Sequence, residues 1–237
     1  MKTILYKAET RGHANHGWLD TYHTFSFARY YNPERIQFGA LRVVNDDILA
    51  GGEGFGTHPH DNMEIVSIPL YGALEHKDSI GNGSVILSGE VQVMSAGTGV
   101  SHSEFNANTS DTVNFFQIWI LPNKNGVKPR YEQQKFDFDN TKNQLIQIVS
   151  PDPKDDGLWF YQNAWFNIGS FDRDYSFDYQ IKEENNGLFA MVIEGEFEVN
   201  GQKLSKRDAL GIWETPSVNI IAKSENARIL LIDVPMF

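Results

Sequence analysis

The stretch GEGFGTHPHDNMEIVSIPLYG, residues 52–72, carries most of the information about the fold and chemistry of this chain. It sets His58 and His60 two residues apart, and His102 and Glu104 repeat that spacing further along. Residues two apart on a strand point to the same face, so each pair presents two side chains to one side of a sheet. Three imidazoles and one carboxylate on neighbouring strands would suit a divalent transition metal. The two segments together therefore predict a metal site built on β-strands.

Short apolar segments separated by glycine and proline recur along the whole chain. They are rich in aromatic and β-branched residues, which favours strands joined by turns, and no long segment has the pattern of an amphipathic helix. The clearest examples are residues 40–44, 64–68, 91–94, 113–121, 187–193, 196–199, 209–213 and 227–232. Many short, evenly spaced strands are typical of β-sandwiches and barrels. We therefore expect an all-β chain.

The chain divides into two halves of different composition. Residues 121–150 form a polar stretch with two prolines, which is typical of a connector between two β units. All seven histidines lie at or before His102, and the 135 residues that follow have none. We place the domains at residues 1–138 and 139–237, with the metal ligands confined to the first.

The composition excludes several classes of function. The chain has no cysteine, so it offers no thiolate nucleophile, no cysteine-ligated zinc and no iron–sulfur cluster. Its 20 basic and 31 acidic residues give a net charge of -11, which disfavours direct binding to nucleic acid through phosphate contacts. We see neither a membrane-spanning apolar run nor a signal peptide, and so we expect a cytoplasmic protein with no membrane association.

Other polar residues in these strands have simpler interpretations. His13 and His16 lie in a loop with glycine and asparagine, where turn formation is the expected role. His23 alternates with aromatic residues and is expected to be a packed or hydrogen-bonded strand residue. His76 lies near a turn and is interpreted as a surface group. Gln117 is the polar residue within an apolar run; it either orients a substrate or a carboxylate from inside the fold, or faces solvent.

Aromatic residues make up 13% of the chain, which would suit a pocket for a flat ring system. We assign most of these rings to the two apolar cores and to the contact between the halves. The candidates for that contact follow the connector and are Trp159, Phe160, Tyr161, Trp165 and Phe166.

Residues 52–72 resemble the first motif of the cupins, although Gly72 comes one residue later than is usual. The segment AGTGVSHSE, residues 96–104, departs from the second motif, because Ser95 stands where a proline is usual. These segments, with the flanking GHANHGWLDTYHTFSFARYYNP and FQIWILPNKNGVKPRYEQ, resemble the pirin family of bicupins. The similarity is greatest to the bacterial branch that has been linked to quercetin cleavage. The similarity is strong over residues 7–138 and weaker towards the C-terminus.

The resemblance implies a bicupin, with two antiparallel β-barrels of the jelly-roll type in tandem and few short helices. It implies that His58, His60, His102 and Glu104 bind one divalent metal, with Fe expected first and Mn, Co, Ni, Cu or Zn as alternatives. Glu64, a ligand in many other cupins, would not be one here. It would either support a ligand or make a hydrogen bond, and the alternative is a strand residue that faces solvent.

The implied activity is a quercetin 2,3-dioxygenase reaction, in which a flavonol and O2 react, the heterocycle opens and CO is released. Glu104 would be the catalytic residue, either as a permanent ligand or as the base for the 3-hydroxyl proton. Two alternatives remain: a metal-binding, redox-sensing regulatory pirin without a flavonol substrate, and a cupin isomerase or lyase acting on a small metabolite. We expect a monomer or a weak homodimer.

Overall fold

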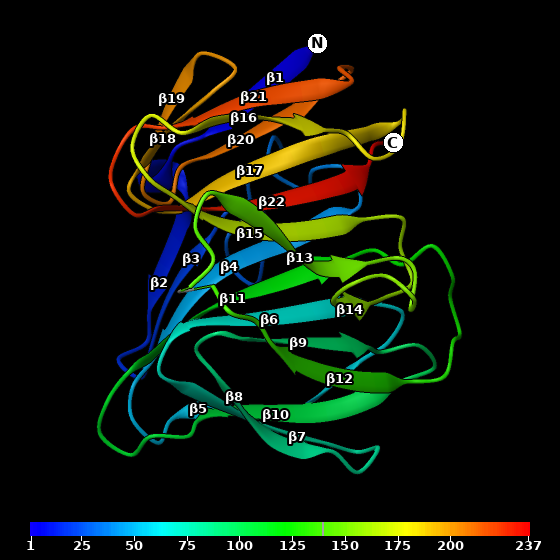
Figure 1. Ribbon diagram of the computed structural model, residues 1–237. Coiled ribbons are helices and arrows are strands. Elements are labelled where there is room, and N and C mark those ends of the chain that lie inside the picture. The colour runs from blue at the N-terminus through cyan, green and yellow to red at the C-terminus, as the bar shows by residue number, and fades with distance from the viewer. Residues whose placement is uncertain (139) are drawn as a thin grey trace.

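The computed structural model describes residues 1–138 and 140–237, and strands dominate it (Figure 1). The N-terminal half contains two antiparallel sheets. The larger has the order β12 (Arg130–Lys135), β9 (Glu90–Ser95), β6 (Glu64–Tyr71), β11 (Val113–Ile120), β4 (Leu41–Leu49), β3 (Leu19–His23) and β2 (Gly12–Asn15). The smaller has the order β5 (Gly54–His60), β10 (Val100–Asn106), β7 (Ala73–Asp78) and β8 (Gly83–Leu87).

The C-terminal half repeats this arrangement of one seven-stranded and one four-stranded sheet. The larger has the order β1 (Lys2–Tyr6), β20 (Ala209–Trp213), β17 (Asn186–Glu194), β22 (Ala227–Pro235), β15 (Trp165–Phe171), β13 (Gln144–Ser150) and β14 (Leu158–Trp159). The smaller has the order β16 (Ser176–Gln180), β21 (Ser217–Ala222), β18 (Glu196–Val199) and β19 (Gln202–Ser205). The one helical segment among the described residues is a 3₁₀ turn, Ala8–Thr10.

All eight strands predicted from the sequence are present. The expected barrels are not confirmed, because the strands of each half pair into two separate sheets that face each other as a sandwich. The predicted connector is also more ordered than expected, since β12 lies within it and pairs with β9. The chain's first strand, β1, pairs with β20 and so belongs to the sheet of the C-terminal half. The division at residues 138 and 139 stays a prediction, and Asp139 itself lies outside the described residues.

The two seven-stranded sheets pack face to face in the middle of the molecule, and the four-stranded sheets lie outside them (Figure 1). A large apolar cluster fills the space between the larger sheets. It combines Phe116 and Ile118 of β11 with Phe189 of β17 and Ile232 of β22. Phe160 is part of it, as expected for the contact between the halves. Burial of this area holds the two halves together.

The interior of the N-terminal sandwich is apolar at its ends and polar in the middle. Along β11, Phe115 belongs to one apolar cluster, Trp119 packs against another, and the buried Gln117 lies between them on the same face. By contrast, an apolar cluster with Leu188 and Leu231 fills the interior of the C-terminal sandwich. Buried polar groups are costly unless they are paired or functional, so the middle of the N-terminal sandwich is where a site is expected. Among the described residues, no helix is long and apolar enough to cross a membrane.

Candidate metal centre and substrate cavity

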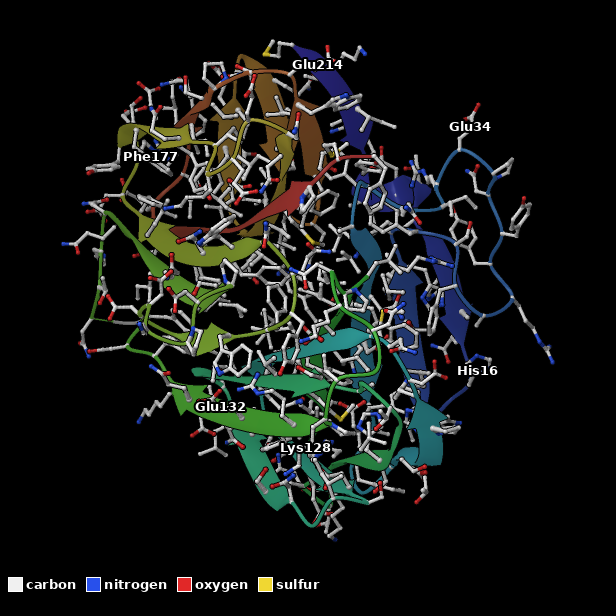
Figure 2. The ribbon with its side chains drawn as sticks, turned by 90° about the vertical axis from the view of Figure 1, so that its right-hand side faces the viewer. His16, Glu34, Lys128, Glu132, Phe177 and Glu214 are labelled. Atoms are coloured by element: carbon white, nitrogen blue, oxygen red, sulfur yellow. The ribbon has the colours of Figure 1, made fainter. Side chains whose placement is uncertain are left out.

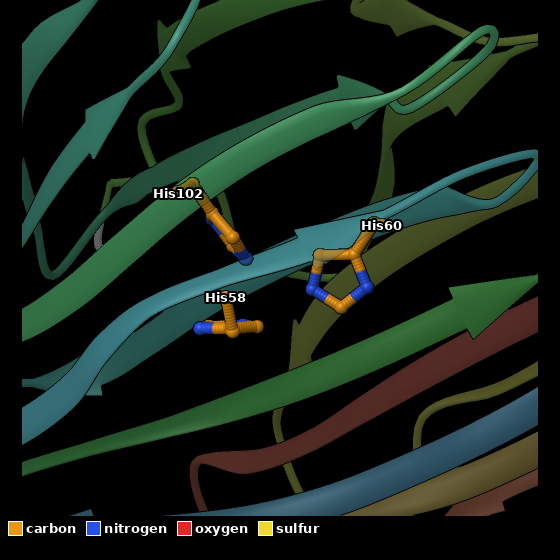
Figure 3. A group of neighbouring side chains, drawn as sticks. All are labelled: His58, His60 and His102. Atoms are coloured by element: carbon orange, nitrogen blue, oxygen red, sulfur yellow. The ribbon is translucent and has the colours of Figure 1, made fainter.

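Three histidines predicted from the sequence converge on one point (Figure 3). His58 and His60 lie on β5, and His102 is directly opposite His58 on the antiparallel strand β10. The ring centroids are 4.5 Å apart for His58 and His102, 4.8 Å for His58 and His60, and 4.9 Å for His60 and His102. The neighbours Thr57 and Pro59 are exposed, so strand alternation turns the imidazoles inward as expected.

The ring nitrogens are arranged as a metal would require. One nitrogen from each of the three imidazoles lies within 4.8 Å of the others. His58 Nδ1 lies 2.8 Å from the carbonyl oxygen of Gly56, so it donates its proton there and leaves Nε2 free for a ligand. His102 Nε2 is buried and has no hydrogen-bond partner among the described residues. A buried nitrogen lone pair without a donor is what a bound cation would satisfy, so these residues fit a divalent metal.

Burial keeps two of these imidazoles neutral. It lowers the pKa of His60 to about 4, with further lowering from His102 and His58. It lowers the pKa of His102 to about 3, again with help from neighbouring imidazoles. Metal ligation requires the neutral ring, so both groups are ready to bind a cation at neutral pH.

Glu104 lies on the buried face of β10, two residues after His102. Its ligand atoms group with those of His102 and His76 rather than with those of His58 and His60. Both of its oxygens accept hydrogen bonds: Gln117 Nε2 donates to Oε2 at 2.7 Å, and Ser67 Oγ donates to Oε1 at 3.2 Å. Of the two roles considered for Gln117, the structure shows the inward one.

The interpretation of His76 as a surface group is wrong. Its side chain is fully buried, stacks on Tyr131 and lies beside His102, and its Nε2 is 3.2 Å from Asp78 Oδ2. The strands explain the error, because β7 pairs with β10 and sets His76 opposite Glu104. The signal in the sequence is the spacing of His76 and Asp78, which repeats the two-residue spacing of the other pairs.

Glu64 makes a hydrogen bond, as expected, but its partner is not one of the proposed metal ligands, and Glu64 does not face solvent. It is buried on the face of β6 opposite Ser67, towards the other half of the molecule, and Ser95 Oγ donates to its Oε2 at 2.6 Å. Burial raises the pKa of Glu64 to about 7, against the lowering effects of Ser95, the Tyr161 amide and Arg130.

The three remaining histidines lie apart from the cluster. His23 is buried and hydrogen-bonded to Asn45 at 2.9 Å, as predicted. His13 lies on β2, where it contacts Asp20, and is therefore a strand residue rather than part of a turn. His16 follows β2 and is exposed at the surface (Figure 2).

A cavity of about 430 Å³ adjoins the histidine cluster. This volume is within the range of small-molecule sites. Its walls are mainly aromatic and apolar, with polar groups between them. The residues that line it include Trp18, Asn45, Asp47, Phe55, Gly56, His58, His60, Glu104, Gln117 and Trp119.

Known proteins show the same organisation. Residues 6–120 match the family described as Pirin, and residues 147–234 match the Quercetinase C-terminal cupin domain. The chain is 46% identical over 231 residues to a quercetin 2,3-dioxygenase of Escherichia coli strain K12, covering 98% of each chain. It is 37% identical to a pirin-like protein of Caulobacter vibrioides, covering 94% of this chain and 95% of that one.

Solved structures agree with the sequence comparison. The bacterial pirin YhhW of Escherichia coli, in complex with nickel(II), superimposes with a TM-score of 0.94 at 43% identity, and each chain is covered completely. The match extends over both halves, so it includes the histidine cluster and the C-terminal sandwich. This chain belongs to the pirin family of bicupins.

Proposed function

We propose that this pirin is a metal-dependent dioxygenase of the quercetinase type. The observation that carries the proposal is the cluster of three imidazoles beside an aromatic-walled cavity. In the proposed reaction one flavonol and one O2 give one CO and one ring-opened ester. The similarity to a named quercetin 2,3-dioxygenase supports this reaction class.

We propose His58, His60, His102 and Glu104 as the residues that hold the ion. When bound, a divalent transition metal supplies Lewis-acid and redox chemistry at these nitrogen and oxygen donors. Iron is the metal that we expect first, and the nickel complex of the E. coli pirin makes nickel the main alternative. Element analysis of the protein purified without added metal distinguishes them.

Side chains of the protein also act on the substrate directly. Glu104 accepts the proton of the flavonol 3-hydroxyl, and Gln117 and Ser67 hold its carboxylate in position by hydrogen bonds at 2.7 and 3.2 Å. Trp18 and Phe55 pack edge to face at 5.4 Å and help to form the wall that excludes water from the bound rings.

The test is aerobic turnover by metal-free protein reloaded separately with Fe, Mn, Co, Ni, Cu or Zn. We expect loss of flavonol absorbance, uptake of one O2 and release of one CO per flavonol with at least one metal. The same metal salts without protein are the control. Absence of turnover with every metal would refute the proposal, and turnover of a small metabolite without O2 uptake would favour an isomerase or lyase.

A further inference from the structure

A second carboxylate, Asp47, lines the same cavity as His58, His60 and Glu104. Asp47 is 4% exposed, and the described residues that line the cavity include no lysine or arginine. A buried carboxylate without a cation is unfavourable for stability. Burial of Asp47 therefore lowers the stability of the folded chain, and a purely structural role does not explain it.

The adjacent residue, Asp46, shows what a structural carboxylate looks like here. It points to the opposite face of β4, as strand alternation requires. There Arg207 Nε lies 2.8 Å and Arg11 Nη1 3.2 Å from its Oδ2, while Asn114 Nδ2 donates to Oδ1 at 2.8 Å. These cations neutralise Asp46 and lie on the wrong side of the sheet to pair with Asp47.

The hydrogen bonds of Asp47 are also incomplete. Thr21 Oγ1 donates to Oδ1, and no hydrogen bond reaches Oδ2 from the described residues. Asp233, a buried aspartate of the C-terminal half, instead accepts from the Asn186 side chain, the Tyr179 hydroxyl and the Lys182 amide at 2.7, 3.1 and 2.9 Å. Burial raises the pKa of Asp47 to about 7, against the lowering effect of its hydrogen bond from Thr21. Asp47 thus has an oxygen available to a donor that enters the cavity.

The register of β4 and β11 places Asp47 at one end of the cavity. Three pairs follow one another on the inner face of these strands: Trp119 with Val43, Gln117 with Asn45, and Phe115 with Asp47. Each pair defines one level of the cavity wall. His60 lies at the first level, because its ring centroid is 4.9 Å from that of Trp119. Glu104 lies at the second level, where Gln117 donates a hydrogen bond to it. Successive levels are about 7 Å apart on a strand. Asp47 marks the third level, furthest from His60.

We propose that Asp47 selects the substrate by accepting a hydrogen bond from a hydroxyl group remote from the edge that approaches the metal ligands. The inference rests on the proposed function and narrows it, because it makes the preferred substrates flavonols with additional hydroxyl groups on their outer rings. A flavonol that carries only the 3-hydroxyl would occupy the cavity without satisfying Asp47.

The test compares binding of quercetin, which has outer-ring hydroxyls, with binding of 3-hydroxyflavone, which has none. Binding is measured anaerobically on the metal-loaded protein by quenching of tryptophan fluorescence, since Trp18 and Trp119 line the cavity. We expect Asp47→Asn to weaken quercetin binding about 10- to 100-fold and to leave 3-hydroxyflavone binding unchanged within about threefold. Asp20→Asn is the matched control, because Asp20 is next to Thr21 on β3 but faces away from the cavity and contacts His13.

Metal content and melting temperature accompany each titration. Asp47→Asn should retain the metal and melt at the same or a higher temperature, because it removes a buried acid that has no cation partner. Equal affinity of the wild-type chain for the two flavonols, or an equal effect of the substitution on both, would overturn the inference. If binding discriminates through Asp47 but quercetin is not consumed with any metal, the proposed dioxygenase function fails and the assignment of Asp47 stands.

Discussion

His76 Nδ1 lies 3.4 Å from His102 Nδ1, which links His102 to Asp78 through a second imidazole. If His102 binds a metal through Nε2, its Nδ1 must carry a proton, and the acceptor is His76 Nδ1. The proton of His76 then resides on Nε2, which is 3.2 Å from Asp78 Oδ2. The chain of three residues thus fixes the tautomer and the orientation of His102.

Replacing His76 should weaken metal binding without removing a ligand. We expect His76→Phe to lower the affinity for nickel or cobalt roughly 10- to 100-fold, as loss of an outer hydrogen-bond partner does in other metal sites. His76→Asn, which can place an acceptor near the position of Nδ1, should restore part of it. Competition with a chelator gives the affinities, and the visible spectrum of the cobalt form reports the geometry. Unchanged affinity in His76→Phe would contradict the role.

Replacing His60 by alanine should remove the metal and leave the protein folded. The His60 imidazole is partly exposed at the cavity and makes no hydrogen bond to another described residue, so the sheet does not depend on it. We expect the metal affinity to fall by more than about 100-fold, which is the upper bound for losing a residue that only hydrogen-bonds to a ligand. His16→Ala is the control, because His16 is an exposed histidine away from the cluster. Full metal occupancy in His60→Ala would show that the ligand set is wrong.

Gln117 should affect turnover, because it positions the proposed base Glu104. Gln117→Leu removes the donor that lies 2.7 Å from Glu104 Oε2 and leaves Ser67 as the remaining side-chain donor to that carboxylate. We expect kcat/KM for a flavonol to fall about 10- to 100-fold. Gln134→Leu on the exposed side of β12 is the matched control. A Gln117→Leu protein with wild-type kcat/KM would mean that the hydrogen bond does not position a catalytic group.

The spacing of the histidines made the cluster predictable, because side-chain direction on a strand depends only on whether two positions differ by an even number. By this rule His58 and His60 share one face of their strand, and so do His102 and Glu104. It could not place His76, since its proximity to Glu104 arises from the pairing of β7 with β10. Strand pairing is a long-range property that local spacing does not contain.

Glu64 and Asp47 show a second limit. The sequence suggests that a polar residue in an antiparallel strand faces either the site or solvent, but both faces of β6 are buried because the C-terminal half covers the outer one. Glu64 therefore lies in an interior that belongs to neither sandwich alone. Asp46 and Asp47 look alike in the sequence, and only the positions of Arg11 and Arg207 separate the paired carboxylate from the unpaired one.

The raised pKa of Glu64 predicts a pH-dependent stability. Between its ordinary value of 4.5 and the folded value of about 7, the folded chain keeps a proton that the unfolded chain releases. Stability is therefore greatest below pH 4.5 for this group and falls as the pH rises to about 7, by at most about 1.4 kcal/mol per pH unit. Glu64→Gln is neutral at every pH and keeps an acceptor for Ser95.

The measurement for Glu64 is the free energy of unfolding by urea at pH 5 and at pH 8. We expect the difference between Glu64→Gln and wild type to shift in favour of the variant as the pH rises. Asp47 titrates in the same range but is common to both proteins, so its contribution cancels. Glu34→Gln, at an exposed loop position, should show no such shift. A constant difference across the range would contradict the assigned ionisation.

Gly56 offers a way to block the cavity while leaving the metal in place. An added Cβ there would meet no atom of the described residues within 4 Å, and Gly56 lines the cavity, so a larger side chain would occupy substrate space. Its carbonyl, which accepts from His58 Nδ1, is retained in any variant. Gly56→Val should therefore keep the metal and lower flavonol affinity at least about 10-fold. Thr57→Val, on the exposed face of the same strand, should change neither. Parallel loss of metal and flavonol in Gly56→Val would instead indicate that β5 had moved, because a purely steric block affects only the larger ligand.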